Sequence, residues 1–181
     1  MSLSQAIDAL IEIGLLKEAE AKLSAEASLS SELTVTKAFL QSHTGDLRKA
    51  QSLAERLLKK DLSDKSRAIC KEVIGRSLLV HGESKGAGLK LIEEARELAA
   101  EKLGKILHAR YACCYVESLL HRVGMSEATA QVEPLRRLVM RSGDPASLAL
   151  THLLKAEIRT REGQLRLAER ELRTVRDLLT R

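Results

Sequence analysis

A glycine followed by an alanine four or five residues later recurs along the whole chain, and this repeat constrains the fold more than any other feature of the sequence. The five segments read GLLKEA, GDLRKA, GESKGA, GMSEA and GQLRLA, and their alanines are Ala19, Ala50, Ala87, Ala128 and Ala168. Successive alanines lie 31, 37, 41 and 40 residues apart. These spacings fall in the range of repeats built from two helices. The sequence therefore predicts a stack of similar helical units.

Helix boundaries coincide with the repeat. Each repeat glycine closes one amphipathic run, as expected if it adopts the positive φ that often follows a helix C-terminus. Ser84 and Ser126 follow two of these glycines and are predicted to cap the next helix. The stretch 142–145, Ser-Gly-Asp-Pro, combines a stop, a cap and a proline suited to a first helical position. We expect helices near 4–13, 15–28, 31–43, 46–60, 64–81, 84–101, 103–122, 126–141, 145–162 and 164–180.

Two of these helices carry further signals. Pro134 falls inside the eighth, where it removes a backbone hydrogen bond and clashes with the preceding turn at about 3 kcal/mol. We therefore expect a kink there, or a helix that begins near Glu133. The final helix has apolar residues at alternating intervals of three and four, which predicts one apolar stripe made of Leu165, Ala168, Leu172, Val175 and Leu179.

The composition favours a folded, helical chain. Hydrophobic residues make up 44% of the 181 residues and charged residues 30%, with only 2 prolines, which argues against disorder. Aromatic residues are just 2%, so the apolar mass is Leu and Ala, the residues with the highest helix propensity. There is no apolar run of about 20 residues and no signal-peptide pattern. We predict a soluble, cytoplasmic, all-α protein without membrane contact.

The spacing within the units resembles the tetratricopeptide repeat (TPR), in which a small residue of the first helix packs on an alanine of the second. Small residues lie twelve positions before the repeat alanine at Ala38, Gly75 and Ala156. The chain departs from the family in its scarcity of aromatics and in the fourth unit, where that position is Val116. The resemblance implies an all-α, TPR-like solenoid of about five antiparallel helix hairpins. It would form a single domain over 1–181, which could itself be a piece of a longer protein.

The stretch HGESKGAGLK, residues 81–90, has the composition of a phosphate-binding loop but not its spacing. A P-loop needs Lys directly after the last glycine and then Ser or Thr, whereas Leu89 separates Gly88 from Lys90. We interpret Gly82 as the end of a helix. Gly86 and Gly88 are then small because two helices pass closely there.

The histidines and cysteines form no catalytic or metal-binding pattern. His43, His81 and His121 each lie just before a repeat glycine, where a histidine can bind the free carbonyls of a helix end. Cys113 and Cys114 suit a packing role, and no C-x-x-C spacing occurs. We predict no catalytic residues, no metal site and no cofactor, and hence a protein that is not an enzyme.

A groove is the first candidate site. If the first helices of successive pairs line a concave surface, as the TPR resemblance implies, that surface exposes Phe39, Glu72, Arg76, Arg110, Glu117, Glu157 and Arg161. Alternating Arg and Glu favour a peptide or helix of mixed charge, although ordinary surface polarity would produce the same pattern. The first prediction is therefore a non-catalytic scaffold that binds a protein or peptide partner.

A basic patch is the second candidate site. The net charge of +5 is concentrated after residue 134, and Arg166, Arg170 and Arg173 share one face of the last helix. This face could bind nucleic acid or an acidic protein. Alternatively it is a solvated face with pairs such as Glu162–Arg166 and Glu169–Arg173. The longer repeat units resemble the helical-repeat sensor regions of large bacterial signal-transducing transcription activators. That resemblance implies the second prediction, a sensor or regulatory segment of a larger bacterial signalling protein or transcription regulator, which contacts nucleic acid or self-associates through this face. The scarcity of aromatics disfavours single-strand binding.

Overall fold

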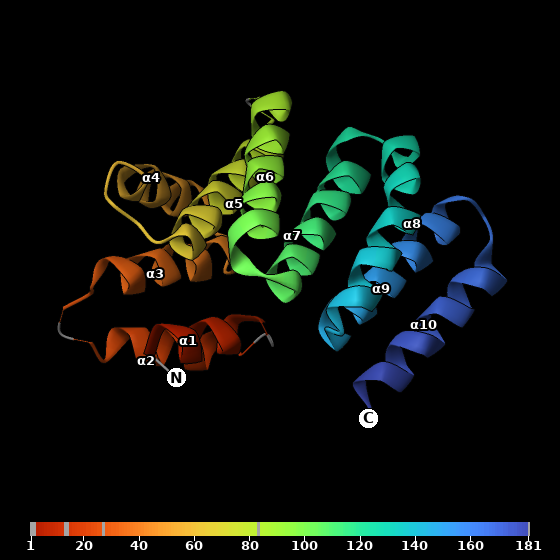
Figure 1. Cartoon of the computed structure of the whole chain (residues 1–181), viewed down its shortest axis with the longest axis horizontal. Helices are drawn as coiled ribbons and strands as arrows, with labels where there is room; N and C mark the ends of the chain where they lie inside the picture. Colours follow the sequence, from red (N-terminus) through yellow and green to blue (C-terminus); the bar gives the residue numbers. More distant parts are fainter. Residues whose placement is uncertain (1–2, 13–14, 27, 83, 181) are drawn as a thin grey trace. The chain divides into compact units, whose positions relative to one another are not determined.

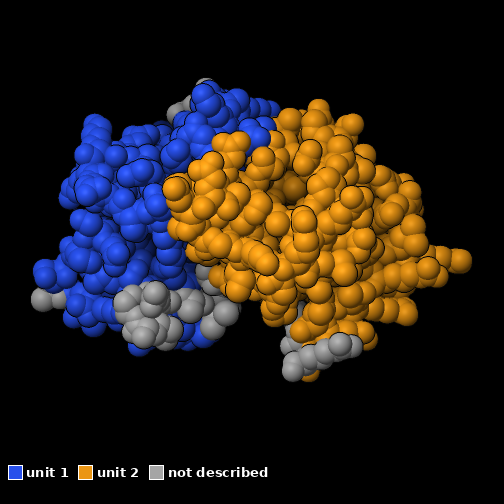
Figure 2. All heavy atoms as spheres, viewed as in Figure 1, with its two compact units in different colours: residues 1–95 blue, residues 96–181 orange. Residues whose placement is uncertain are grey.

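The computed structural model describes residues 3–12, 15–26, 28–82 and 84–180, and in these ranges the chain forms ten α-helices, two π-helical turns and no strand (Figure 1). The all-α prediction is confirmed. None of the helices in these ranges is both long and apolar enough to cross a bilayer. The chain divides into two compact units, residues 1–95 and 96–181 (Figure 2).

Unit 1 contains three helix hairpins, the last of which extends past its boundary. Its helices are α1 (Leu3–Glu12), α2 (Leu16–Ser24), α3 (Ser31–His43), α4 (Leu47–Leu57), α5 (Asp64–His81) and α6 (Lys85–Leu98). α1 packs on α2 and α3 on α4, and α3 also packs on both α1 and α5. First helices of successive hairpins are therefore neighbours within this unit, as in a stack of repeats.

Unit 2 contains two hairpins and both π-turns. Its elements are η1 (Ala99–Leu103), α7 (Lys105–Ser118), η2 (Leu119–Val123), α8 (Met125–Ser142), α9 (Pro145–Arg161) and α10 (Leu165–Leu179). α7 packs on α8 and α9 on α10, and the first helices α7 and α9 also contact each other. The π-turns, which the sequence pattern did not predict, extend α6 and α7 by a wider turn. They account for part of the extra length of the later repeats.

Small residues lie where helices cross. The predicted alanines are buried in four of the five units, at Ala19, Ala50, Ala128 and Ala168. In the third unit the predicted register is wrong by one residue, because Ala87 is exposed and Gly88 is buried. A Cβ on Gly88 would lie 2.8 Å from the carbonyl oxygen of Gly75, so α5 and α6 touch backbone to backbone. Gly86 has open space around it, so the predicted close packing is wrong there.

Two predicted helix boundaries are confirmed. The carboxylate of Asp144 accepts a hydrogen bond from the backbone N–H of Ser147 at 3.1 Å, and Pro145 is the first residue of α9. Gly82 follows α5 with a φ of 72°, the left-handed conformation that a side chain disfavours. The segment that resembles a phosphate loop therefore includes the end of α5, the left-handed Gly82 and the first residues of α6.

The predictions for the fourth repeat are partly wrong. α8 begins at Met125, so Ser126 lies in its first turn and does not cap it. Gly124 occupies the capping position with an extended backbone, φ 178°. The proposed helix start near Glu133 is also wrong, because α8 continues through Pro134. Since Pro134 is exposed, water can bind the carbonyl that loses its partner.

The predicted apolar stripe of the last helix is only partly buried. Ala168 and Val175 of α10 are buried, while Leu165 is 64% exposed and Leu172 50% exposed. The side chain of Leu179 lies outside the described residues. α10 packs on α9 through its small residues, so the two long leucines at the edge of the contact remain in solvent.

Candidate functional site

The buried cysteines are packing residues. Burial raises the pKa of the Cys70 and Cys113 thiols to about 11. A thiol with a raised pKa stays protonated near neutral pH and is a poor nucleophile. Cys113 instead packs between α7 and α9, with its Sγ 3.6 Å from the carbonyl oxygen of Ser147. Within the described ranges, no group of three His, Cys, Asp or Glu side chains could hold a metal ion.

Two of the histidines bind helix-end carbonyls, as predicted. His43 Nδ1 lies 3.0 Å from the carbonyl oxygen of Phe39, and His81 Nδ1 lies 2.9 Å from that of Ser77. Because a carbonyl only accepts, each Nδ1 donates and each Nε2 is left as an acceptor in the neutral ring. His121 differs, since its ring nitrogens face side chains of α9.

In unit 1 the predicted groove residues form a tightly packed cluster. Arg76 Nη1 lies 3.5 Å from Glu72 Oε1 and 3.5 Å from His43 Nε2. Glu72 is only 8% exposed. Phe39 packs against both apolar clusters of the unit and edge-on against His43, with ring centres 4.5 Å apart. These three predicted residues lie together, with Glu72 buried and Phe39 and Arg76 half-buried.

In unit 2 the corresponding cluster is open to solvent and has shorter bonds. Arg161 Nη2 donates to Glu157 Oε1 at 2.6 Å and to His121 Nδ1 at 3.2 Å. His121 Nε2 lies 3.3 Å from Glu157 Oε2, which closes a ring of three side chains. Arg161 Nη1 also donates to the carbonyl oxygen of Leu120, one of the free carbonyls at the end of η2. The side chains of Glu157 and Arg161 are 36% and 39% exposed.

The two remaining predicted groove residues, Arg110 and Glu117, both lie on α7 but differ in their contacts. Arg110 Nε donates to Asp144 Oδ2 at 3.3 Å, so it supports the cap of α9. Burial alone would raise the pKa of Asp144, but the hydrogen bonds from Ser147 and Arg110 and the charge of Arg110 lower it. Glu117 is half-buried and makes no hydrogen bond or ion pair with any residue that the structure describes.

Leu153 is an exposed residue on the face of Glu157 and Arg161 that the sequence pattern did not indicate. It lies on α9 one turn before Glu157 and two turns before Arg161, and residues four apart share a helix face. Its side chain is 42% exposed. The repeat spacing did contain this signal. Leu153 lies three residues before Ala156, as Glu72 lies three residues before Gly75 in the third unit. An apolar side chain at this position cannot be told from a core residue by the sequence alone.

The basic patch is exposed and only partly paired. Arg173 Nη2 donates to Glu169 Oε1 at 2.6 Å, which confirms one of the predicted pairs. Glu162 instead lies near Arg159, so the predicted pair with Arg166 does not form. Arg166 and Arg170 are exposed, and neither side chain is ion-paired within the part of the chain that the structure describes.

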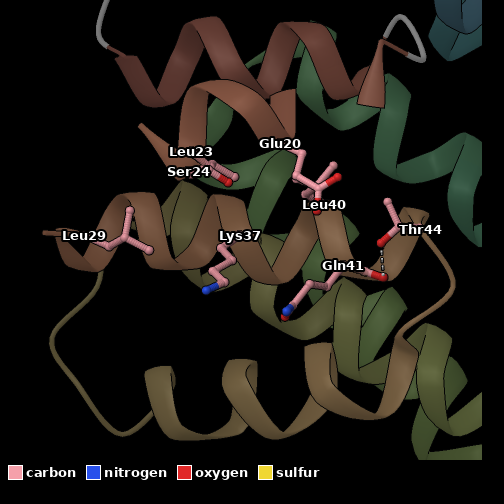
Figure 3. Close-up of a pocket in the computed structure, with 8 residues that line it drawn as sticks. All are labelled: Glu20, Leu23, Ser24, Leu29, Lys37, Leu40, Gln41 and Thr44. Atoms are coloured by element: carbon pink, nitrogen blue, oxygen red, sulfur yellow. Dashed lines mark hydrogen bonds between the residues drawn. The ribbon is translucent and has the colours of Figure 1, made fainter. Parts of the chain in front are cut away.

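A cavity of about 210 Å³ lies between α2 and α3 in unit 1 (Figure 3). Leu23, Leu29 and Leu40 give it an apolar lining, and Glu20 and Lys37 add one charge of each sign. Gln41 also lines it, and the buried Oε1 of this side chain has no hydrogen-bond partner among the described residues. Figure 3 shows Gln41 and Lys37 leaving α3 in the same direction, on the side away from Glu20. The cavity is therefore a hollow between two hairpins, without polar groups that converge on one point.

Known structures with a similar fold are helical-repeat proteins. No protein-family model matches the sequence, and comparison with curated proteins finds no match. Nearly identical TPR-like repeats from Podosopora anserina, described as those of a kinesin light chain, match with a TM-score of 0.60 at 18% identity. That match covers 98% of this chain and 93% of the other. BtubC (BKLC) from P. vanneervenii matches with a TM-score of 0.65 at 14% identity, over 98% of this chain and 78% of the other.

At these identities the likeness concerns the fold alone. It agrees with the hairpins, the buried alanines and the packing of first helix on first helix in each unit. The chain has the TPR-like helical-repeat fold, an all-α solenoid.

Proposed function

We propose that the protein is a non-catalytic scaffold that binds a peptide or a partner domain through the groove face of α7 and α9. TPR-like folds generally mediate protein–protein interaction, and solenoids use extended surfaces for it. The observation that carries the proposal is the pairing of an exposed apolar residue, Leu153, with an unpaired carboxylate, Glu117, on neighbouring helices. The ring of His121, Glu157 and Arg161 belongs to the same region, because His121 lies in η2, directly after α7, and Glu157 and Arg161 lie on α9.

The chemistry of this surface favours a partner segment with a basic and an aliphatic side chain. Glu117 offers a carboxylate to Lys or Arg, and an apolar side chain can cover Leu153. Glu157 and Arg161 already neutralise each other, so they favour polar groups over a second full charge. Because two hydrogen bonds and the contact between His121 and Glu157 hold the ring, a partner would lose little entropy in ordering it.

Selection from a random peptide library against the full chain tests the proposal. Enriched peptides are expected to combine Lys or Arg with Leu, Ile or Val. The variants Leu153→Asp and Glu117→Gln should each weaken the binding of a selected peptide by about tenfold, since each removes one contact worth about 1.4 kcal/mol. Leu167→Asp on α10 is the matched control, because Leu167 is 39% exposed and Leu153 is 42% exposed.

Equal losses for Leu153→Asp and Leu167→Asp would contradict a specific groove. So would selected peptides whose affinity is unchanged by both groove variants. Fluorescence anisotropy with a labelled selected peptide gives the affinities, and a urea unfolding curve for each variant shows whether the fold is retained.

The regulatory alternative draws support from Arg166 and Arg170, which are exposed and have no ion-pair partner in the described ranges. In this alternative the chain is a sensor or regulatory segment, and its Arg-rich face contacts nucleic acid or a second copy. Duplex DNA is a suitable probe, because its binding by these side chains should weaken steeply with added salt. Charge reversal of Arg166, Arg170 and Arg173 should abolish the binding. Unchanged binding, or binding that is insensitive to salt, would exclude the patch.

A further inference from the structure

A second cavity, in unit 2, combines cationic and hydrogen-bonding side chains with an apolar lining. It has a volume of about 80 Å³ and lies between the end of α6, α7 and α8. Arg96, His108 and Gln131 are its polar lining residues. The rest of the lining is aliphatic and consists of Ala112, Val116, Pro134, Leu135 and Leu138. Apolar pockets with a few polar groups of this kind are the usual form of small-molecule sites.

The charges around His108 are positive. Burial lowers the pKa of His108, and the positive charges of Arg96 from α6 and Arg141 from α8 lower it further. Arg96 is held in position by Tyr115, with its guanidinium carbon 4.4 Å from the ring centre. Arg141 is tied to its own helix by a hydrogen bond from Nε to the carbonyl oxygen of Arg137. Two fixed cations beside a half-buried imidazole make this cavity attractive to an anion.

The lining limits which anion fits. A phosphate or sulfate has no apolar part, so most of this lining would face an ion that gains nothing from it. A carboxylate with a short hydrocarbon tail matches both halves of the cavity, because Arg and His donate to its oxygens and the tail covers the leucines. The volume of about 80 Å³ leaves room for a carboxylate and only a few further carbon atoms. The tail is therefore short.

We propose that this cavity binds a small aliphatic carboxylate, with the carboxylate group at Arg96, His108 and Gln131 and the hydrocarbon tail on Val116, Leu135 and Leu138. The site is independent of the proposed groove. His108, Ala112 and Val116 follow one face of α7, whereas Arg110 and Glu117 lie on roughly the opposite face by helical spacing. Either site can fail its test without affecting the other.

Titration of the full chain with butyrate, followed by NMR of the histidine ring protons, tests the proposal directly. Butyrate should shift the His108 signals and raise the pKa of that ring, because the bound anion offsets the two arginines. His43 and His81 bind backbone carbonyls in unit 1 and serve as internal controls. Absence of any His108 shift, or an equal shift at His43 and His81, would overturn the proposal.

A series of related small molecules tests which class of ligand the cavity binds. From acetate to propionate to butyrate, affinity should rise about fourfold per methylene, the value for one buried CH₂. Butyramide, which is neutral, should bind at least about tenfold more weakly than butyrate, because it cannot replace the charged hydrogen bonds. Inorganic phosphate should bind less tightly than butyrate. Equal binding of butyramide, or tighter binding of phosphate, would each contradict the proposed ligand class.

Variants complete the test. Arg96→Met keeps an unbranched apolar side chain and removes the guanidinium charge, so butyrate affinity should fall about tenfold or more. Arg137→Met, at an exposed arginine of α8 that pairs with Glu133, should leave the affinity unchanged. In wild type the affinity should decrease as pH rises through the titration of His108, whereas in His108→Gln it should be independent of pH over that range. An unaltered pH dependence in His108→Gln would overturn the role of this ring.

Discussion

The two clusters of Glu, Arg and His, one in each unit, contain the same residue types but differ in burial. In unit 1 the side chain of Glu72 is 11% exposed and its contact with Arg76 is 3.5 Å long. In unit 2 the side chain of Glu157 is 36% exposed and its bond from Arg161 measures 2.6 Å. The first cluster therefore has a buried carboxylate beside an Arg76 side chain that is 32% exposed, whereas all three side chains of the second cluster are 36–39% exposed.

This difference shows that residue type alone does not identify a binding surface in a repeat fold. The two Glu–Arg pairs occupy different positions in the repeat, because Glu72 lies three residues before Gly75 whereas Glu157 lies one residue after Ala156. The second pair therefore lies about one turn further along its helix. In unit 1 the direct backbone contact of Gly75 and Gly88 draws α5 and α6 together. In unit 2 a π-turn alters the end of α7 and presents His121 to α9.

Replacing Gly88 with valine should have the largest effect, because it disturbs the packing of the helix that carries the unit 1 cluster. Its Cβ would lie 2.8 Å from the Gly75 oxygen and 2.9 Å from Leu79 Cγ, so α6 must move away from α5. We expect a loss of about 3 kcal/mol in the free energy of unfolding, measured with urea. Gly86→Ala, two residues earlier, has open space and should be neutral or stabilising by up to about 1 kcal/mol. Equal losses for the two variants would refute the backbone contact.

Replacing Glu72 or Glu157 with alanine should show that the two clusters contribute differently to the free energy of unfolding. Glu72→Ala removes a buried carboxylate and leaves Arg76 without this partner, so the free energy of unfolding should fall by about 1–3 kcal/mol. Glu157→Ala breaks a solvent-exposed pair and should cost less than about 1 kcal/mol. Urea unfolding of both variants measures the difference. A larger loss for Glu157→Ala would reverse the assignment of which cluster is structural.

The pH dependence of unit 2 should depend on Glu171, which joins α9 to α10. Burial alone would raise the pKa of Glu171, but hydrogen bonds from Lys155 and His152 outweigh burial and lower it. A carboxyl whose pKa is lower in the folded state stabilises the fold above its unfolded pKa, about 4.3, and loses that effect as pH falls through the folded value. Glu171→Gln should therefore cost about 1 kcal/mol at pH 7 and less at acidic pH.

The matched control for this prediction is Glu169→Gln. Glu169 also pairs with a cation, Arg173, but both side chains are more than 60% exposed, so the variant should change stability little at any pH. Urea unfolding at several pH values from 3 to 7 gives the comparison. A cost of Glu171→Gln that is constant across this range would contradict the lowered pKa.

Most of the fold could be predicted from the sequence, because the repeat consists of residues that act directly on the local backbone. Glycines, alanines and the Asp144–Pro145 boundary act locally, through φ, size and capping, and their effects survive without knowledge of tertiary packing. The predicted register of the third repeat was wrong by one residue because Ala87 and Gly88 are both small. Only the approach of α5 decides which of the two is buried. The π-turns were missed for a related reason, since no residue type marks them.

The candidate site was harder to predict because exposure depends on neighbouring elements. Phe39 and Glu72 have the residue types of a binding surface, yet packing against neighbouring helices buries most of their area. Leu153 has the residue type of a core position and is exposed. Arg110 looked free in the sequence, but it faces the cap of a helix 34 residues away. Each of these outcomes follows from contacts distant in sequence.

The central claim is that a partner binds the open cluster of unit 2 and not the packed cluster of unit 1. Titration of the full chain with a library-selected peptide, followed by backbone amide NMR shifts, tests it most directly. The largest shifts should occur at Glu117, His121, Leu153 and Glu157, with only small shifts at Phe39, Glu72 and Arg76. Largest shifts at the unit 1 residues, or on the arginines of α10, would contradict the claim.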